Sequence, residues 1–197
     1  MDTGRFEKQL AFILEADKEK NILRQTHLTG HGRRENDAEH AWHMAMMIYL
    51  LKEYSNREID IAKTMMMALI HDIVEIDAGD TYAYDTMGLE TQKEREQRAA
   101  ERIFGMLPED QCSELRALFD EFEACESAEA RFARTMDNFQ PLLLNHSNGG
   151  ADWRAHQVTK SKVVGRQQTS KLGSEAIWEY TEDLIRENVK KGCILDA

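Results

Sequence analysis

The sequence predicts an all-α fold, a single bundle of about six to eight helices, on three observations. Apolar residues mostly recur at intervals of three and four, which is the spacing of one helical face. Only two prolines interrupt the 197 residues, and no segment shows the alternation that favours a strand. With a hydrophobic share of 42%, a chain of this length can bury one core, so we expect residues 1–197 to form a single domain.

Each expected helix is bounded by a local signal. Asn36 or Asp37 can cap the second helix, and Glu39 is placed for a capping-box contact back to Asn36. Gly79 can end the third helix because glycine adopts left-handed backbone at little cost, and Pro108 can open a later one because its missing N–H loses no hydrogen bond there. The expected helical ranges are about 6–20, 36–54, 58–79, 90–104, 108 to a gap near 127, 127 to about 145, 153–165 and 174–190.

Composition and charge exclude several classes of protein. A formal net charge of −11 without a basic patch argues against a nucleic-acid polymer or an acidic membrane surface as partner. The first ten residues lack the basic flank and apolar stretch of a signal peptide, and no run approaches the roughly 20 apolar residues of a membrane span. Cys112, Cys125 and Cys193 are far apart and outside any CxxC pattern, so we expect reduced thiols in a cytoplasmic protein.

Three ionisable residues stand inside apolar helical faces, where an unpaired charge is too costly to persist. Asp72 follows Leu69 and Ile70 in an apolar stretch, and Asp137 lies among Phe132, Met136 and Phe139. His40 precedes a stripe of methionine, isoleucine and leucine. Each of these groups needs a compensating partner.

A shared divalent cation would supply that partner. It would neutralise both aspartates and accept neutral imidazoles as ligands, a mixed oxygen and nitrogen set that favours manganese, cobalt, iron or zinc over magnesium. The separation of His40 and His71 is the length of a helical hairpin, so the two side chains can face each other, and Asp137 arrives from a later helix. Four protein ligands on a six-coordinate ion would leave about two positions for water and substrate.

Simpler explanations remain open at this point. A His-Asp dipeptide arises easily by chance in a chain with seven histidines and many acidic residues. Each aspartate could instead pair with a buried arginine, for example Arg131 or Arg134 before Asp137, and His40 could be a core histidine with its hydrogen bonds satisfied.

The order of these residues resembles a known family. His40, then His71 and Asp72, then Asp137 match the H…HD…D signature of the HD-domain superfamily. More narrowly, EH at 39–40, HDIVEIDAGD at 71–80, LPED at 107–110 and SAEARFARTMDN at 127–138 are similar to the HD-domain 5'-deoxynucleotidase group. The similarity covers about residues 10–145, which leaves the helices at 151–190 as a C-terminal addition to this core.

The resemblance implies a function and a set of site residues. It implies that His40, His71, Asp72 and Asp137 bind one divalent ion, cobalt, manganese or magnesium in that group, within a helical bundle that is often a homodimer. It assigns Glu75 and Asp80 to catalysis, in which one carboxyl handles the proton of the attacking water and the other protonates the leaving 5'-oxygen. The implied substrates are nucleoside 5'-monophosphates, preferentially deoxy ones. The resemblance therefore implies a site made of four metal ligands and two catalytic carboxyls: His40, His71, Asp72, Asp137, Glu75 and Asp80.

The phosphate of such a substrate requires a cationic partner. Arg24 is the first candidate, because it falls where the family carries a phosphate-contacting arginine, although the tryptophan or proline that accompanies it in relatives is missing here. Arg33 and Arg34 are alternatives, and we expect them to be solvated. His43, one turn after His40, is either an additional ligand or, as we expect, a packed or hydrogen-bonded histidine.

The sequence therefore predicts an HD-domain phosphomonoesterase acting on a small phosphorylated substrate. Two other hypotheses of function remain. A di-iron oxygenase of HD type would use redox-active iron and extra histidines such as His43. A non-catalytic binding module would keep the metal for structure, and it would bind the metal tightly, show no turnover and unfold on chelation.

Overall fold

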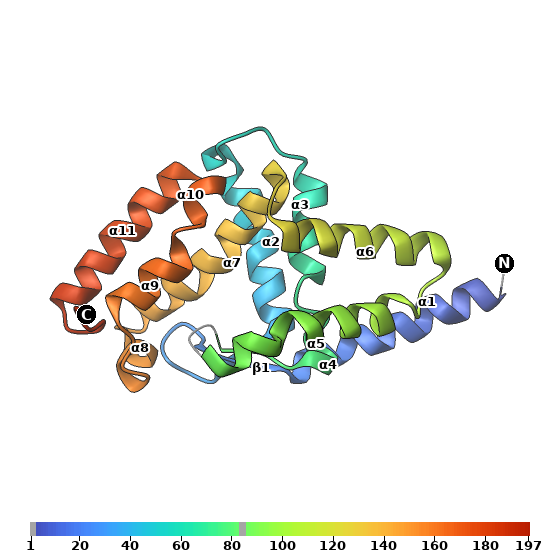
Figure 1. The fold of residues 1–197 in the computed structure, drawn as a ribbon, viewed down its shortest axis with the longest axis horizontal. Coiled ribbons are helices and arrows are strands. Elements are labelled where there is room, and N and C mark those ends of the chain that lie inside the picture. Colours follow the sequence, from blue (N-terminus) through green and yellow to red (C-terminus); the bar gives the residue numbers. More distant parts are fainter. Residues whose placement is uncertain (1–2, 83–85) are drawn as a thin grey trace.

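The computed structural model describes residues 3–82 and 86–197, and it confirms the all-α fold class (Figure 1). Helix α7 lies between α2 and α3 on one side and α9, α10 and α11 on the other, while α1, α5 and α6 extend away from it (Figure 1). The elements are α1 (Thr3–Ala16), a 3-10 turn (Asp17–Asn21), β1 (Leu23–His27), β2 (Arg34–Asn36), α2 (Asp37–Leu51), a 3-10 turn (Lys52–Tyr54), α3 (Ile61–Ile70), α4 (Glu75–Ala78), α5 (Thr86–Phe104), α6 (Glu109–Ala124), α7 (Ala128–Ser147), α8 (Ala151–Ala155), α9 (Lys160–Gln167), α10 (Ser170–Gly173) and α11 (Glu175–Lys190).

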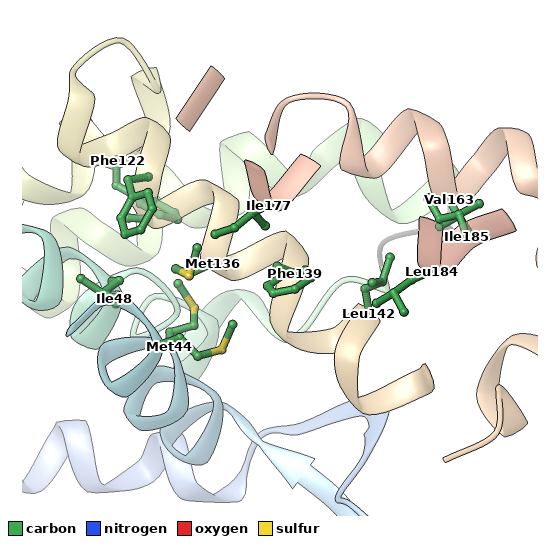
Figure 2. Packing of buried hydrophobic residues seen from close by; sticks show 14 of the residues in the cluster. Met44, Ile48, Phe122, Met136, Phe139, Leu142, Val163, Ile177, Leu184 and Ile185 are labelled. Carbon is green, nitrogen blue, oxygen red and sulfur yellow. The ribbon is translucent and has the colours of Figure 1, made fainter. Parts of the chain in front are cut away.

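Side chains from α2, α7 and α11 form the main hydrophobic core. Figure 2 shows Met44 of α2 beside Met136 of α7, and Leu142 of α7 near Leu184 of α11. Met44 and Met136 are completely buried. Since full burial of such a side chain contributes roughly 1.5–3 kcal/mol, this core fixes α7 and the polar groups on its other positions.

Several predicted helix boundaries are confirmed. The Asn36 side chain accepts the Glu39 N–H at 2.9 Å, and Glu39 returns a contact to the Asn36 N–H, so the capping box at the start of α2 is complete. Gly79 follows α4 with a φ of 74°, the left-handed value expected of it. Pro108 immediately precedes α6, and Ser127 caps α7 by accepting the Ala130 N–H.

The expectation of no strand was wrong. Leu23–His27 and Arg34–Asn36 pair as a small antiparallel hairpin, with Leu23 opposite Asn36 and His27 opposite Arg34. These strands are short and mostly polar, so they carry none of the apolar alternation on which strand prediction depends. Their backbone groups pair with each other and with the side chains of Asn148, just after α7, and Asp152 in α8, rather than with a large sheet.

Two expected helices are interrupted. The helix expected over 58–79 ends at Ile70, and residues 71–74 form turns before α4 begins at Glu75. The helix expected over 153–165 is likewise divided into α8 and α9. Conversely, α7 continues to Ser147, so the turn expected from Asn145 begins later. The break at 71–74 matters most, because His71 and Asp72 lie in it.

Among the described residues, no helix has the length and apolar character needed to cross a membrane.

Candidate metal centre

The four predicted ligands meet at one place, which we call the central cluster: His40, His71, Asp72 and Asp137. They come from α2, from the turns after α3, and from α7. The His40 Nε2 atom lies 3.3 Å from Asp137 Oδ1 and 4.0 Å from Asp72 Oδ2. The His71 Nε2 atom lies 3.1 Å from Asp72 Oδ2 and 3.8 Å from Asp137 Oδ1. Ligand atoms from three helical regions therefore converge on a space the size of one ion.

Both imidazoles are held so that Nε2 faces the other ligands. His71 Nδ1 lies 2.8 Å from the Ala68 carbonyl oxygen, which can only accept, so this nitrogen carries the proton. His40 Nδ1 donates to Gln140 Oε1 at 3.0 Å, and the Gln140 amide is oriented by donating from Nε2 to Glu35 at 2.6 Å. This is the outer-shell arrangement that fixes the tautomer of a metal-ligating histidine.

The donor set of the central cluster fits a divalent cation. His71 Nε2 is buried, and in the part of the chain that the structure describes it has no hydrogen-bond partner. Burial lowers the pKa of the His71 imidazole, but the neighbouring Asp72 outweighs it and raises that pKa to about 9. Positive charge between the carboxylates of Asp72 and Asp137 is therefore favourable. A divalent ion would replace the proton and leave His71 as a neutral ligand.

The electrostatics of the two aspartates point the same way. Burial opposes ionisation of both side chains. For Asp72, the charges of His71 and Arg24 outweigh burial and lower its pKa. For Asp137, Arg166, the nearby His40 ring and Arg134 outweigh burial and hold its pKa well below the usual range. Both groups are therefore available as anionic ligands.

A cleft opens from the central cluster, and six of the seven predicted site residues line it. His40 is the exception, because it lies fully buried behind the other ligands. The lining residues from the prediction are Arg24, His71, Asp72, Glu75, Asp80 and Asp137. Three predicted ligands and the two predicted catalytic carboxyls therefore share one cleft.

Glu75 is buried at the first position of α4, beside Asp72. Burial and the charge of Asp72 raise the pKa of its carboxyl, and its Oε2 atom has no hydrogen-bond partner among residues 3–82 and 86–197. Asp80 is half-buried and also lines the cleft, and burial raises its pKa against the opposing charge of Arg24. Both carboxyls are thus poised to hold a proton.

Arg24 lies in β1 and reaches into the cleft. Its Nη1 atom donates to Asp72 Oδ2 at 2.6 Å and to Asp37 Oδ1 at 3.2 Å. The expected phosphate-contacting arginine is therefore at the metal centre, where it now neutralises Asp72. Asp37, which sequence reasoning considered only as a cap, is completely buried and shares this arginine.

Sequence reasoning missed two residues that support the centre, Gln140 and Arg166, and it named a third, Arg134, only as a possible charge partner of Asp137. Gln140 orients His40, and only its polar side chain within the apolar stretch after Asp137 could have signalled it. Arg134, considered only as a charge partner, lies 3.2 Å from Asp137 Oδ2 and lines the cleft. Arg166 of α9 lies 3.3 Å from the same oxygen and also lines the cleft. Arg166 carried no local signal, because its function depends on how α9 packs on α7.

The alternative residues have other partners. His43 bonds to Gln140 through Nδ1 at 3.1 Å and lies outside the central cluster, as expected of a hydrogen-bonded histidine. Arg33 is exposed and pairs with Glu39. Arg131 donates to the Cys125 carbonyl, so Arg134 rather than Arg131 pairs with Asp137.

Comparison with known proteins agrees with this geometry. A family model described as "HD domain" matches residues 16–178. The chain is 32% identical over 111 residues to the human protein named 5'-deoxynucleotidase HDDC2, a match that covers 56% of this chain and 53% of that protein. The chain thus spans about half the length of the curated relatives it matches first.

Solved structures resemble most of the chain. A protein from Magnetospirillum magnetotacticum described as a predicted metal-dependent phosphohydrolase is 47% identical, with a TM-score of 0.92 over 97% of this chain and 96% of that one. A conserved hypothetical protein from Pyrococcus furiosus, 23% identical, shares the fold with a TM-score of 0.60 over 90% of this chain and 99% of that one.

Proposed function

The chain belongs to the HD domain family, and we propose that it is a metal-dependent phosphohydrolase that releases phosphate from nucleoside 5'-monophosphates, deoxy forms included. One observation carries the proposal. Two imidazole Nε2 atoms and two carboxylates converge next to a cleft, with the buried carboxyl of Glu75 beside them. The relative named 5'-deoxynucleotidase and the neighbour named phosphohydrolase support the same class of reaction.

The central cluster would hold one divalent ion, and the mixed imidazole and carboxylate set favours manganese, cobalt, iron or zinc over magnesium. A cation held there supplies a Lewis acid, which lowers the pKa of water and polarises a phosphoryl group. His40, His71, Asp72 and Asp137 would act as its ligands.

Glu75 and Asp80 would divide the proton transfers. Glu75 is the more deeply buried and stands beside the ligand Asp72. The positive charge of a divalent ion held there would lower the pKa of the Glu75 carboxyl, so we assign to it the proton of the attacking water. Asp80 lines the same cleft and would give a proton to the leaving 5'-oxygen. No side chain needs to become covalently attached to the phosphoryl group.

Three arginines would hold the phosphate in an otherwise acidic protein. Arg24, Arg134 and Arg166 all line the cleft, and each lies within 3.3 Å of a carboxylate oxygen of Asp72 or Asp137. Their guanidinium groups can turn from these carboxylates to a phosphate oxygen, a ligand that arginine binds in the same fork geometry.

We further propose that the chain forms a homodimer through one face of α2. Trp42, Met46, Tyr49 and Leu50 are exposed, and their spacing places them along one side of the helix. Light scattering of the wild type and of a Leu50→Glu variant tests this, since a charge in the interface would shift the mass towards one chain.

A di-iron oxygenase is the second candidate, and one observation favours it. Asp37, Asp72 and Glu75 also place ligand oxygens within 4.8 Å of one another, beside the central cluster and sharing Asp72. Such a centre would consume oxygen with iron and release no phosphate.

Phosphate release tests the proposal directly. Metal-free protein would receive manganese, cobalt, magnesium, zinc or iron separately and then ribo- and deoxynucleoside 5'-monophosphates. We expect metal-dependent release that Asp137→Ala abolishes and that the exposed-carboxylate control Asp120→Ala leaves intact. Phosphate release with no metal in the wild type would overturn the assignment, and oxygen uptake with iron alone would establish the second candidate.

A further inference from the structure

A second group of metal-ligating side chains lies outside the central cluster. We call it the hairpin cluster: His27 at the end of β1, His31 in the turn that follows, and Asp152 in α8. His27 Nδ1 lies 2.7 Å from Asp152 Oδ1, and His31 Nδ1 lies 4.0 Å from the same oxygen. Potential ligand atoms of all three residues lie within 4.8 Å of one another.

The backbone around the hairpin cluster is fixed by hydrogen bonds that do not use its ligand atoms. Asn148, just after α7, accepts the His31 N–H at 2.8 Å and donates to the carbonyls of His27 and Leu28 at 3.1 Å. The His27 N–H donates to Asp152 Oδ2 at 3.2 Å, which leaves Oδ1 directed at the two rings. The site is therefore preorganised by its surroundings, as a metal site requires.

A hydrogen bond between His27 and Asp152 would explain why these two side chains lie together, but it would not explain the position of His31. The His31 ring lies 4.4 Å from the His27 ring between centroids, and its Nδ1 faces the same carboxylate beyond hydrogen-bond distance. His31 also adopts a φ of 55°, an unusual value for a residue with a side chain. A shared ion would account for the positions of all three side chains.

The distances suit such an ion. Zinc binds imidazole nitrogen and carboxylate oxygen at about 2.0–2.2 Å, so two of its tetrahedral ligands lie roughly 3.3 Å apart. The separations of 2.7 and 4.0 Å from Asp152 Oδ1 lie on either side of that value. His31 is about half exposed, so its side chain can move the small distance required.

We propose that His27, His31 and Asp152 form a second metal site that takes zinc or a similar transition ion, separate from the central cluster. The ion would tie the β1–β2 turn to α8. Because Asp152 also lines the cleft, the bound ion would add positive charge at its rim, where an acidic chain otherwise repels an anionic substrate.

Counting bound zinc tests the proposal. Chelator-stripped protein would be titrated with zinc against a chromophoric competitor, and the number of ions per chain would be measured. We expect two for the wild type, one for His31→Ala, one for Asp137→Ala and none for the double variant. His156→Ala, which removes an exposed histidine outside the hairpin cluster, should still bind two.

One ion in both the wild type and His31→Ala would overturn the proposal, and so would two ions in both. His31 lies exposed in a turn, so its replacement leaves the core intact and the comparison does not depend on the Asp137 variant being folded. If the Asp137→Ala chain binds one zinc, loss of that zinc on adding His31→Ala locates it in the hairpin cluster. These outcomes are independent of whether the enzyme hydrolyses phosphate.

Discussion

The central cluster and the hairpin cluster use the same chemical groups in opposite surroundings. The ligands of the central cluster have side-chain exposures of 0–13%, whereas His27 and His31 of the hairpin cluster are 24% and 48% exposed. In the interior, water does not solvate the carboxylates, so they need a positively charged neighbour. Arginines and His71, whose pKa is raised, provide that positive charge. In the hairpin cluster Asp152 is itself buried, but water reaches the rings of its two histidine partners. Burial therefore decides how strongly each group of ligands requires a cation.

The largest expected effect concerns Glu75, the buried carboxyl beside the central cluster. Glu75→Gln should lower kcat by about 10²–10⁴-fold, the typical contribution of a general acid or base. Thermal stability should not fall, because burial and Asp72 already disfavour the charged carboxyl. Steady-state kinetics and a melting curve measure both. The exposed control Glu114→Gln should leave kcat unchanged, and an unchanged kcat in Glu75→Gln would remove its catalytic assignment.

Metal binding should stabilise the fold mainly through the central cluster. Manganese at 100 times its Kd should add about 2.7 kcal/mol. That raises Tm by roughly 5–11 °C for a chain of this size. Manganese ranks low among first-row ions in affinity, so it should load the buried four-ligand site before the three-ligand rim. Scanning calorimetry with and without manganese checks this, and the rise should disappear in Asp137→Ala but persist in His31→Ala.

Gln140 should matter for the central cluster alone. Gln140→Leu removes the acceptor of the His40 Nδ1 proton and should weaken metal affinity there by about 10–100-fold. Gln140→Glu keeps an acceptor and should restore part of the affinity. Competitive titration measures both variants, with zinc in the hairpin cluster as an unaffected internal reference. Equal affinities in the leucine and wild-type proteins would contradict a positioning role for Gln140.

The smallest effects should appear in metal-free protein. His40→Ala removes the donor to the buried Gln140 Oε1 atom and the ring beside Asp137, and it should cost about 1–3 kcal/mol in unfolding free energy. His31→Ala changes an exposed turn and should stay within about 0.5 kcal/mol of the wild type. Urea denaturation in the presence of a chelator compares the two. A similar loss of unfolding free energy at both positions would show that the two clusters do not differ in stability for reasons of burial.

Helical periodicity and caps located most of the fold. The Asn36 and Ser127 caps were readable because a cap acts on backbone groups two or three residues away. The hairpin of β1 and β2 was not readable, because its strands are short and polar and their order depends on contacts with α7 and α8. The break at 71–74 was hidden within a continuous apolar stretch that suits helix and turn alike.

By itself, the sequence determined the helical fold class and placed His40, His71, Asp72 and Asp137 on elements that could converge. Only the tertiary structure decided which distant side chains contact them: Gln140 lies against His40, 100 residues away, and Arg166 against Asp137. It likewise brought Asp152 against His27, 125 residues away. The physical reason is range. Periodicity and caps record interactions within a few residues, whereas the orientation of a ligand depends on side chains that only packing of distant helices brings together.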